Sequence, residues 1–92
     1  MAIRILTLCG AGIGTSEILR VSAQRALGRI GIAAEVSATD VARVREQSED
    51  AQVILTSPEH VATIGRTSAQ VIVIDNILDQ AELEAKLSDA LD

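Results

Sequence analysis

The sequence predicts an α/β fold, in which a four-stranded parallel sheet with helices on both faces forms one small domain over residues 1–92. Strand-like and helix-like apolar patterns alternate along the whole chain. Most of the strand-like segments are apolar at nearly every position, as is typical of strands buried on both faces of a parallel sheet. The 92 residues include no Phe, Tyr or Trp, so the core must consist of Ile, Leu, Val and Ala.

The first third of the chain predicts a strand, a helix and a second strand. The first strand is expected over Ile3–Leu8. The helix is expected over Ser16–Ile30, because its apolar residues recur at spacings of three and four and form one buried stripe. Gly31 favours the end of that helix, and the second strand is expected over Ile32–Ala38.

The middle of the chain predicts two short helical segments on either side of a buried strand. Thr39-Asp40 offers an N-cap for a short helix or irregular loop over Val41–Gln47. The third strand is expected over Ala51–Thr56, which is almost continuously apolar. Ser57 is expected to cap a short helix over Pro58–Gly65, which has a proline at its first position.

The last third predicts one more strand and one more helix. The fourth strand is expected over Gln70–Asp75. Asp79 and Glu82 have the spacing of a capping box with Asp in place of Ser or Thr, which predicts a helix that continues to about Leu91.

The order of the strands identifies the expected place of a ligand site. Right-handed crossovers in a doubly wound sheet favour the order 2-1-3-4, numbered along the chain. In that order the chain reverses direction between the first and third strands. Ligands bind at such a switch point, at the carboxyl ends of the strands. The lone cysteine, Cys9, directly follows the first strand there.

Cys9 begins a glycine-rich loop that runs into the first helix. Glycines allow successive backbone N–H groups to form an anion-binding nest, and the start of a helix adds further N–H donors and a partial positive charge. We therefore predict that the Cys9 thiol is a nucleophile aimed at a phosphate. The phosphate-binding residues are expected to be Gly10, Ala11, Gly12, Ile13, Gly14, Thr15 and Ser16.

Four other interpretations of this loop fit less well. A nucleotide-binding P-loop needs a lysine that is absent near Gly14, and in a dinucleotide fingerprint the third glycine would come one residue later. A cysteine phosphatase loop needs an arginine where Thr15 stands, so the bidentate phosphate clamp is missing. The purely structural alternative makes Cys9 a small buried residue in a tight turn. The pattern favours a cysteine that accepts a phosphoryl group and passes it on.

Composition excludes several function classes. A net charge of −5 without aromatic residues is a poor basis for nucleic-acid binding. No apolar run approaches the roughly 20 residues of a membrane span, and no signal peptide is evident, so no direct insertion into the membrane is expected. One cysteine forms no internal disulfide and no Cys-rich metal site, which favours the cytoplasm. The acidic segment 75–92 is either a solvated helix face or part of a surface that docks a basic partner.

The chain resembles the cysteine-phosphorylated enzyme IIB subunits of the bacterial sugar phosphotransferase system. The segment Cys9–Ser16 is similar to the loop of the ascorbate and galactitol types. The resemblance covers essentially the whole chain, and three further segments agree with it: Ala38–Val41, Val53–Ser57 and Val71–Asn76. The last two are more similar to the ascorbate type.

The resemblance implies a phosphotransferase role and a set of partners. A phosphorylated IIA protein would donate a phosphoryl group to Cys9, which would pass it to a sugar held by the membrane permease IIC. The sugar would be ascorbate-like or galactitol-like, the protein would be cytoplasmic, and neither a metal nor an organic cofactor is implied. The alternatives that remain are a small cysteine phosphatase or related thiol enzyme, and an adaptor domain that reuses the fold.

Two further residues are candidates for assisting the transfer. His60 is the only histidine and follows the third strand closely, but an exposed position in the first turn of a helix is the favoured explanation, since a helix N-terminus disfavours a protonated imidazole. Asp75 ends the fourth strand on the same edge as Cys9, where it would act as an acid, orient the loop, or simply cap a turn.

Overall fold

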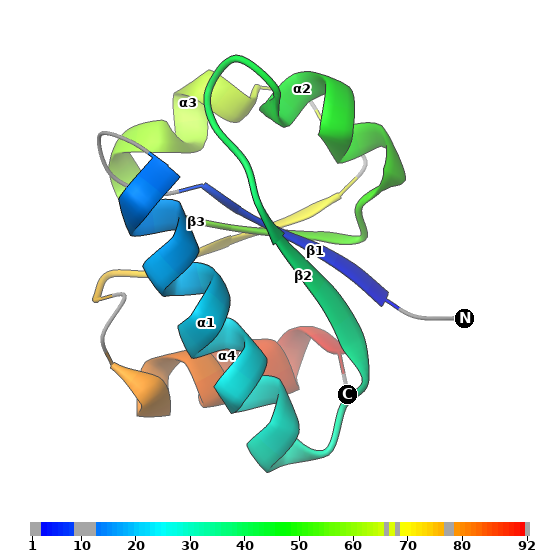
Figure 1. Cartoon of the computed structure of the whole chain (residues 1–92), viewed down its shortest axis with the longest axis vertical. Helices are drawn as coiled ribbons and strands as arrows, with labels where there is room; N and C mark the ends of the chain where they lie inside the picture. Colours follow the sequence, from blue (N-terminus) through cyan, green and yellow to red (C-terminus); the bar gives the residue numbers. More distant parts are fainter. Residues whose placement is uncertain (1–2, 9–12, 66, 68, 77–78, 92) are drawn as a thin grey trace.

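The computed structural model describes residues 3–8, 13–65, 67, 69–76 and 79–91, and it contains one parallel four-stranded sheet in the predicted order (Figure 1). Strand β1 (Ile3–Leu8) lies between β2 (Ala34–Ala38) and β3 (Val53–Thr56). Strand β4 (Gln70–Val73) pairs with the other side of β3. The order β2-β1-β3-β4 confirms the predicted fold class and places the switch point between β1 and β3.

Helices cover both faces of this sheet. The long helices α1 (Ile13–Ile30) and α4 (Gln80–Leu91) pack against each other on one face. The opposite face carries four short segments, shown above the sheet in Figure 1. They are α2 (Val44–Gln47), the 3-10 helix η1 (Ser48–Asp50), the 3-10 helix η2 (Pro58–His60) and α3 (Val61–Ile64).

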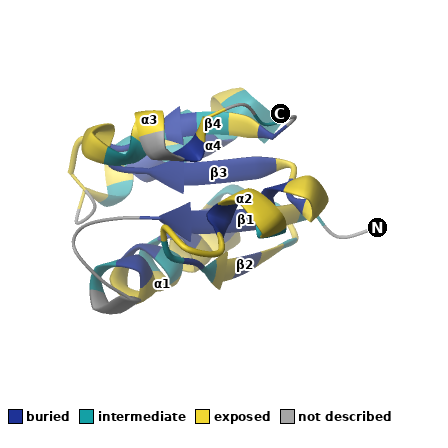
Figure 2. Cartoon of the chain, turned by 90° about the horizontal axis from the view of Figure 1, so that it is seen from above, coloured by how far each residue is buried: buried dark blue, intermediate teal, exposed yellow. Residues whose placement is uncertain are grey.

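The side chains of β1 and β3 alternate between two aliphatic clusters. Ile5, Val53 and Leu55 point toward α1 and α4. Leu6 and Ile54 point the other way, toward Val44 of α2 and Ile64 of α3. Strand β3 is buried along its whole length, whereas the edge strand β2 is partly exposed (Figure 2). The core therefore consists of two aliphatic layers, one on each face of the sheet, and contains no aromatic side chain.

The end of α1 is the predicted one. Gly31 has φ +77, a conformation that favours glycine, and the N–H of Ile32 donates to the carbonyl of Leu27 at 3.0 Å. This bond pattern is a Schellman motif, and it takes up the two residues after the helix. Strand β2 consequently begins at Ala34, two residues later than the pattern predicts.

Helix α1 begins at Ile13, earlier than the predicted Ser16. The sequence assigns Gly14 to the glycine-rich loop, and glycine has a low helix propensity. The first turn of a helix makes few intrahelical bonds, so a glycine is tolerated there. The predicted segment over Val41–Gln47 likewise shortens to α2, because Asp40 Oδ1 accepts bonds from the N–H groups of Ala42 and Arg43, each at 3.0 Å, and holds a turn before the helix.

The described part of the chain holds no helix that is long and apolar enough to cross a membrane.

Candidate functional site

The carboxyl ends of the four parallel strands lie side by side along one end of the sheet, and backbone hydrogen bonds join the residues there. The backbone hydrogen bonds of the parallel ladder continue beyond the last paired residues of the strands. Three backbone N–H···O bonds do this: Thr39 to Thr7 at 2.9 Å, Ser57 to Leu8 at 3.3 Å and Ile74 to Thr56 at 2.8 Å. In Figure 1 this edge lies on the side where α1 begins.

The predicted glycine-rich loop is divided between two parts of the chain. Cys9, Gly10, Ala11 and Gly12 lie outside the described residues. Residues 13–16 form the first turn of α1, so half of the predicted loop is helical. An 18-residue helix therefore starts four residues after Cys9 in the sequence, and its first turn carries the partial positive charge of a helix N-terminus.

A buried hydrogen bond fixes the first turn of α1 on the end of β1. Thr7 Oγ1 donates to the carbonyl oxygen of Ser16 at 2.9 Å, and the two residues are 0% and 1% exposed. Thr15 is half-buried. The predicted phosphate ligands Thr15 and Ser16 are thus located in the helix turn nearest the switch point, on the α1 face of the sheet.

His60 and Asp75 lie near the same edge in different surroundings. His60 is half-buried at the end of η2, and its N–H donates to the Ser57 carbonyl at 3.1 Å. The Asp75 carboxylate is 77% exposed and lies 3.9 Å from Lys86 Nζ. Strand β4 ends at Val73, so Asp75 lies two residues beyond the strand instead of at its predicted end, and its side chain pairs with a cation of α4.

The turn after β4 is clamped by Glu82, and the capping box is only half formed. Asp79 Oδ1 accepts the N–H of Glu82 at 3.2 Å, as predicted. The Glu82 carboxylate accepts the N–H groups of Asp75 and Asn76 instead, at 2.8 and 3.0 Å, so the prediction that it bonds back to Asp79 is wrong. Lys86 Nζ then joins Glu82 Oε2, at 2.7 Å, to the carbonyl of Val73, at 2.6 Å.

The pKa of Glu82 is lowered from its ordinary value of 4.5, chiefly by the hydrogen bond from Lys86 and, against the effect of burial, by the two backbone N–H groups. A carboxyl whose pKa is lower in the folded state stabilises the protein above its unfolded pKa. That contribution disappears as the pH falls through the lower, folded pKa. We expect Glu82→Gln to cost about 1–2 kcal/mol at neutral pH and much less at pH 3.

Urea unfolding between pH 7 and pH 3, followed by far-UV circular dichroism, measures this difference. The control is Glu35→Gln, since the Glu35 side chain is 64% exposed and forms only a surface ion pair with Arg4. A Glu82→Gln penalty that is the same at both ends of the pH range would show that the carboxylate charge does not hold the turn.

The acidic segment 75–92 is therefore not a uniformly solvated face. Glu82 is paired with Lys86 in the turn after β4, and Glu84 Oε2 lies 3.2 Å from Arg29 Nε of α1. Asp79 caps α4. In the described part of the chain, no group of three or more His, Cys, Asp or Glu side chains is arranged to hold a metal ion.

The sequence missed the environment of Ser57. The residue occupies the N-cap position before Pro58, but its side chain makes no capping hydrogen bond, so that part of the prediction is wrong. Ser57 is 6% exposed, and its Oγ has no hydrogen-bond partner in the described structure. The sequence signal that could have identified it is a hydroxyl residue directly after a buried strand, at the carboxyl ends of the strands.

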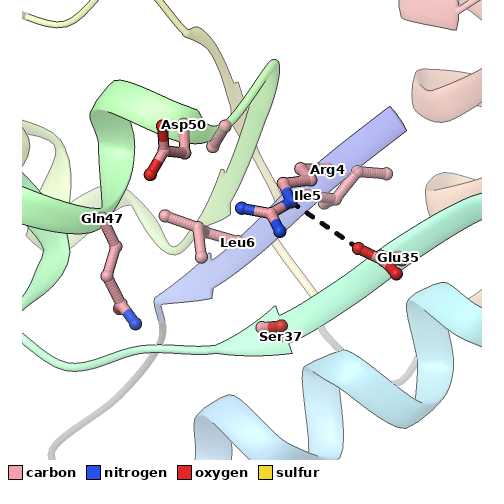
Figure 3. Close-up of a pocket in the computed structure, with 8 residues that line it drawn as sticks. Arg4, Ile5, Leu6, Glu35, Ser37, Gln47 and Asp50 are labelled. Atoms are coloured by element: carbon pink, nitrogen blue, oxygen red, sulfur yellow. Dashed lines mark ion pairs between the residues drawn. The ribbon is translucent and has the colours of Figure 1, made fainter. Parts of the chain in front are cut away.

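A cavity of about 260 Å³ lies away from the predicted loop. Figure 3 shows it between β1, β2 and the segment α2–η1, with Arg4 and Glu35 paired across its wall at 3.6 Å. Both side chains are at least 60% exposed. The cavity is an open groove over the middle of β1 and β2, whereas ligands of this fold class bind at the carboxyl ends of the strands.

Comparison with known proteins agrees with this architecture. The family model described as "PTS system, Lactose/Cellobiose specific IIB subunit" matches residues 4–89. The "Ascorbate-specific PTS system EIIB component" of Mycoplasma pneumoniae is 23% identical over 97% of this chain and 95% of its own length. The protein of the same name from Shigella sonnei is 28% identical over 99% of this chain and 91% of its own length.

A solved structure shows the same fold. The lactose-specific IIB domain from Streptococcus pneumoniae superimposes with a TM-score of 0.62 and 19% identity, covering 99% of this chain and 92% of that one. The family model and this shared fold together confirm the resemblance inferred from the sequence.

Proposed function

Because this chain belongs to the family of lactose/cellobiose-specific IIB subunits of the sugar phosphotransferase system, we propose that it carries a phosphoryl group on Cys9. The donor is a phosphohistidine of a IIA protein, and the acceptor is a sugar bound by the membrane permease IIC. The protein acts in the cytoplasm and needs no metal or organic cofactor. The observation that carries the proposal is the position of Cys9 in the sequence, between the end of β1 and the start of α1 at the switch point.

The proposed reaction consists of two displacements at phosphorus. In the first, the Cys9 thiolate attacks, an S–P bond forms, the N–P bond of phosphohistidine breaks, and the imidazole leaves. In the second, a sugar hydroxyl attacks, an O–P bond forms, the S–P bond breaks, and the hydroxyl proton passes to a base or to water. The positive end of α1 favours the phosphoryl charge throughout.

The lack of an arginine in the loop separates a carrier from a phosphatase. Thr15 stands where a cysteine phosphatase has its arginine. A phosphatase needs that bidentate clamp to stabilise the charge of the hydrolytic transition state. A carrier works better without it, because the group must wait for the next acceptor instead of going to water.

The proposed sugar is ascorbate-like, with a galactitol-like sugar as the second candidate. The support is that two relatives, each aligned with at least 97% of this chain, are named ascorbate-specific. The family description names lactose and cellobiose instead. Phosphorylation of labelled ascorbate, galactitol, lactose and cellobiose by membranes that contain the partner permease separates these sugars.

Intact mass spectrometry tests the carrier role. The protein is incubated with phosphoenolpyruvate, the general phosphotransferase proteins and a IIA protein. We expect a gain of one phosphoryl group and no sustained turnover of p-nitrophenyl phosphate. An unchanged mass in the presence of phosphorylated IIA would contradict the proposal, and steady aryl phosphate turnover would favour the phosphatase.

A further inference from the structure

Ser57 has one hydrogen-bonding group that the fold leaves unused. Its N–H donates to the Leu8 carbonyl at 3.3 Å, and its own carbonyl accepts from His60 N–H at 3.1 Å and Thr56 Oγ1 at 3.2 Å. Its Oγ is buried without a partner among the described residues. A buried hydroxyl in that state destabilises the protein, so its presence calls for an explanation.

The backbone of Ser57 determines the face on which this hydroxyl lies. Ser57 has φ −82 and ψ 158, which continues the extended conformation of β3. Val53 and Leu55 belong to the cluster under α1 and α4, so alternation along the strand places Ser57 on that same face. Leu55 is paired with Thr7, whose hydroxyl holds the first turn of α1. The Ser57 side chain is therefore on the face where α1 begins.

The two strands beside Ser57 differ in what they place level with it. On the β4 side, the register of Thr56 with Val73 continues to Ser57 and Ile74, and Ile74 is an apolar residue that is 1% exposed. On the β1 side, the bond from Ser57 N–H reaches Leu8, the residue that precedes Cys9. Level with Ser57, the β4 side therefore presents an apolar residue, and the β1 side leads into the segment after Leu8 that the sequence predicts to bind phosphate.

We propose that Ser57 is a further residue of the phosphoryl site, with its Oγ–H donating a hydrogen bond to an oxygen of the group on Cys9. The inference rests on the proposed carrier function. No covalent bond to Ser57 is made or broken in the transfer. A hydroxyl that has no partner until the phosphoryl group arrives stabilises the phosphorylated state and the transition state more than the free protein, which is how a contact accelerates a transfer.

Two serine-to-alanine variants separate this role from a structural one. Ser57→Ala should slow phosphoryl acceptance by about 10- to 100-fold, as expected for the loss of one hydrogen bond to a charged group, without lowering the urea midpoint. Ser48→Ala is the matched control. Ser48 is 5% exposed, and its hydroxyl already donates to the Arg45 carbonyl at 2.9 Å. This variant should lower the midpoint and leave the rate unchanged.

The outcomes distinguish failure of the inference from failure of the carrier function. Acceptance by Ser57→Ala at the wild-type rate would overturn the inference and leave the carrier function standing. A slow Ser57→Ala whose midpoint falls as that of Ser48→Ala does would also overturn it, since the hydroxyl would then be structural. Recovery of the rate in Ser57→Thr, which keeps the hydroxyl, supports the contact. A wild-type protein that accepts no phosphoryl group refutes the carrier function and, with it, this role of Ser57.

Discussion

Cys9→Ser should abolish phosphoryl acceptance, with the rate falling by about 10³-fold or more, as happens when an enzyme loses its nucleophile. A serine hydroxyl is protonated at neutral pH, and this loop supplies neither a base nor a cation to activate it. The measurement is the rate of mass gain with phosphorylated IIA in excess. Far-UV circular dichroism of the variant checks that the fold is retained.

His60→Asn is the control for this prediction. His60 is the only histidine of the chain. The proposed IIA donor carries the phosphoryl group on a histidine, so His60 is the alternative acceptor to test. We expect this variant to accept the phosphoryl group at the wild-type rate. A Cys9→Ser variant that still gains the group, together with loss of the gain in His60→Asn, would move the acceptor from Cys9 to His60.

Leu55→Ala should destabilise the domain by about 2–5 kcal/mol, a large part of the roughly 5–15 kcal/mol that holds a typical domain together. Leu55 is 0% exposed in the centre of the sheet, within the cluster under α1 and α4. No aromatic side chain is available to fill the cavity that the truncation leaves. The urea midpoint should fall by about 1–3 M. Circular dichroism is the method of choice, because the protein has no tryptophan fluorescence.

Ile18→Ala is the matched control for this core substitution. Ile18 lies on α1 and is 47% exposed, so its truncation removes little buried surface. Alanine also has the higher helix propensity, and the net change should stay within about 0.5 kcal/mol. Equal losses in the two variants would mean that Leu55 is not part of a close-packed core.

The parts of the fold that the sequence predicted are those determined by local patterns. The apolar runs of β1 and β3 locate the central strands, and the positive φ of Gly31 ends α1 where predicted. The strand order follows from the handedness of the crossovers, which holds for almost every parallel sheet. These features depend on chain chirality and on hydrophobic periodicity, and both can be judged from one sequence.

The parts that the sequence did not predict depend on side chains far apart in the chain. The sequence predicts that Glu82 completes the capping box. Its carboxylate instead accepts the N–H groups of Asp75 and Asn76, and Lys86 holds the carboxylate in that position. Ser57 has the sequence of an N-cap, and only its burial beside the carboxyl end of β1 shows that the hydroxyl is unused. The loop residues Cys9 to Gly12 remain predictions from the sequence.

Phosphorus-31 NMR of the phosphorylated protein, combined with mass spectrometry of its proteolytic peptides, tests the central claim most directly. The phosphorus of phosphocysteine, which is bonded to sulfur, has a different chemical shift from phosphorus bonded to oxygen or nitrogen in the other phosphorylated amino acids. We predict one phosphorothiolate resonance, with the added mass on the peptide that contains Cys9. A phosphoramidate resonance with the mass on the His60 peptide, or no resonance when the IIA protein is fully phosphorylated, would contradict the assignment of Cys9 as the phosphoryl carrier.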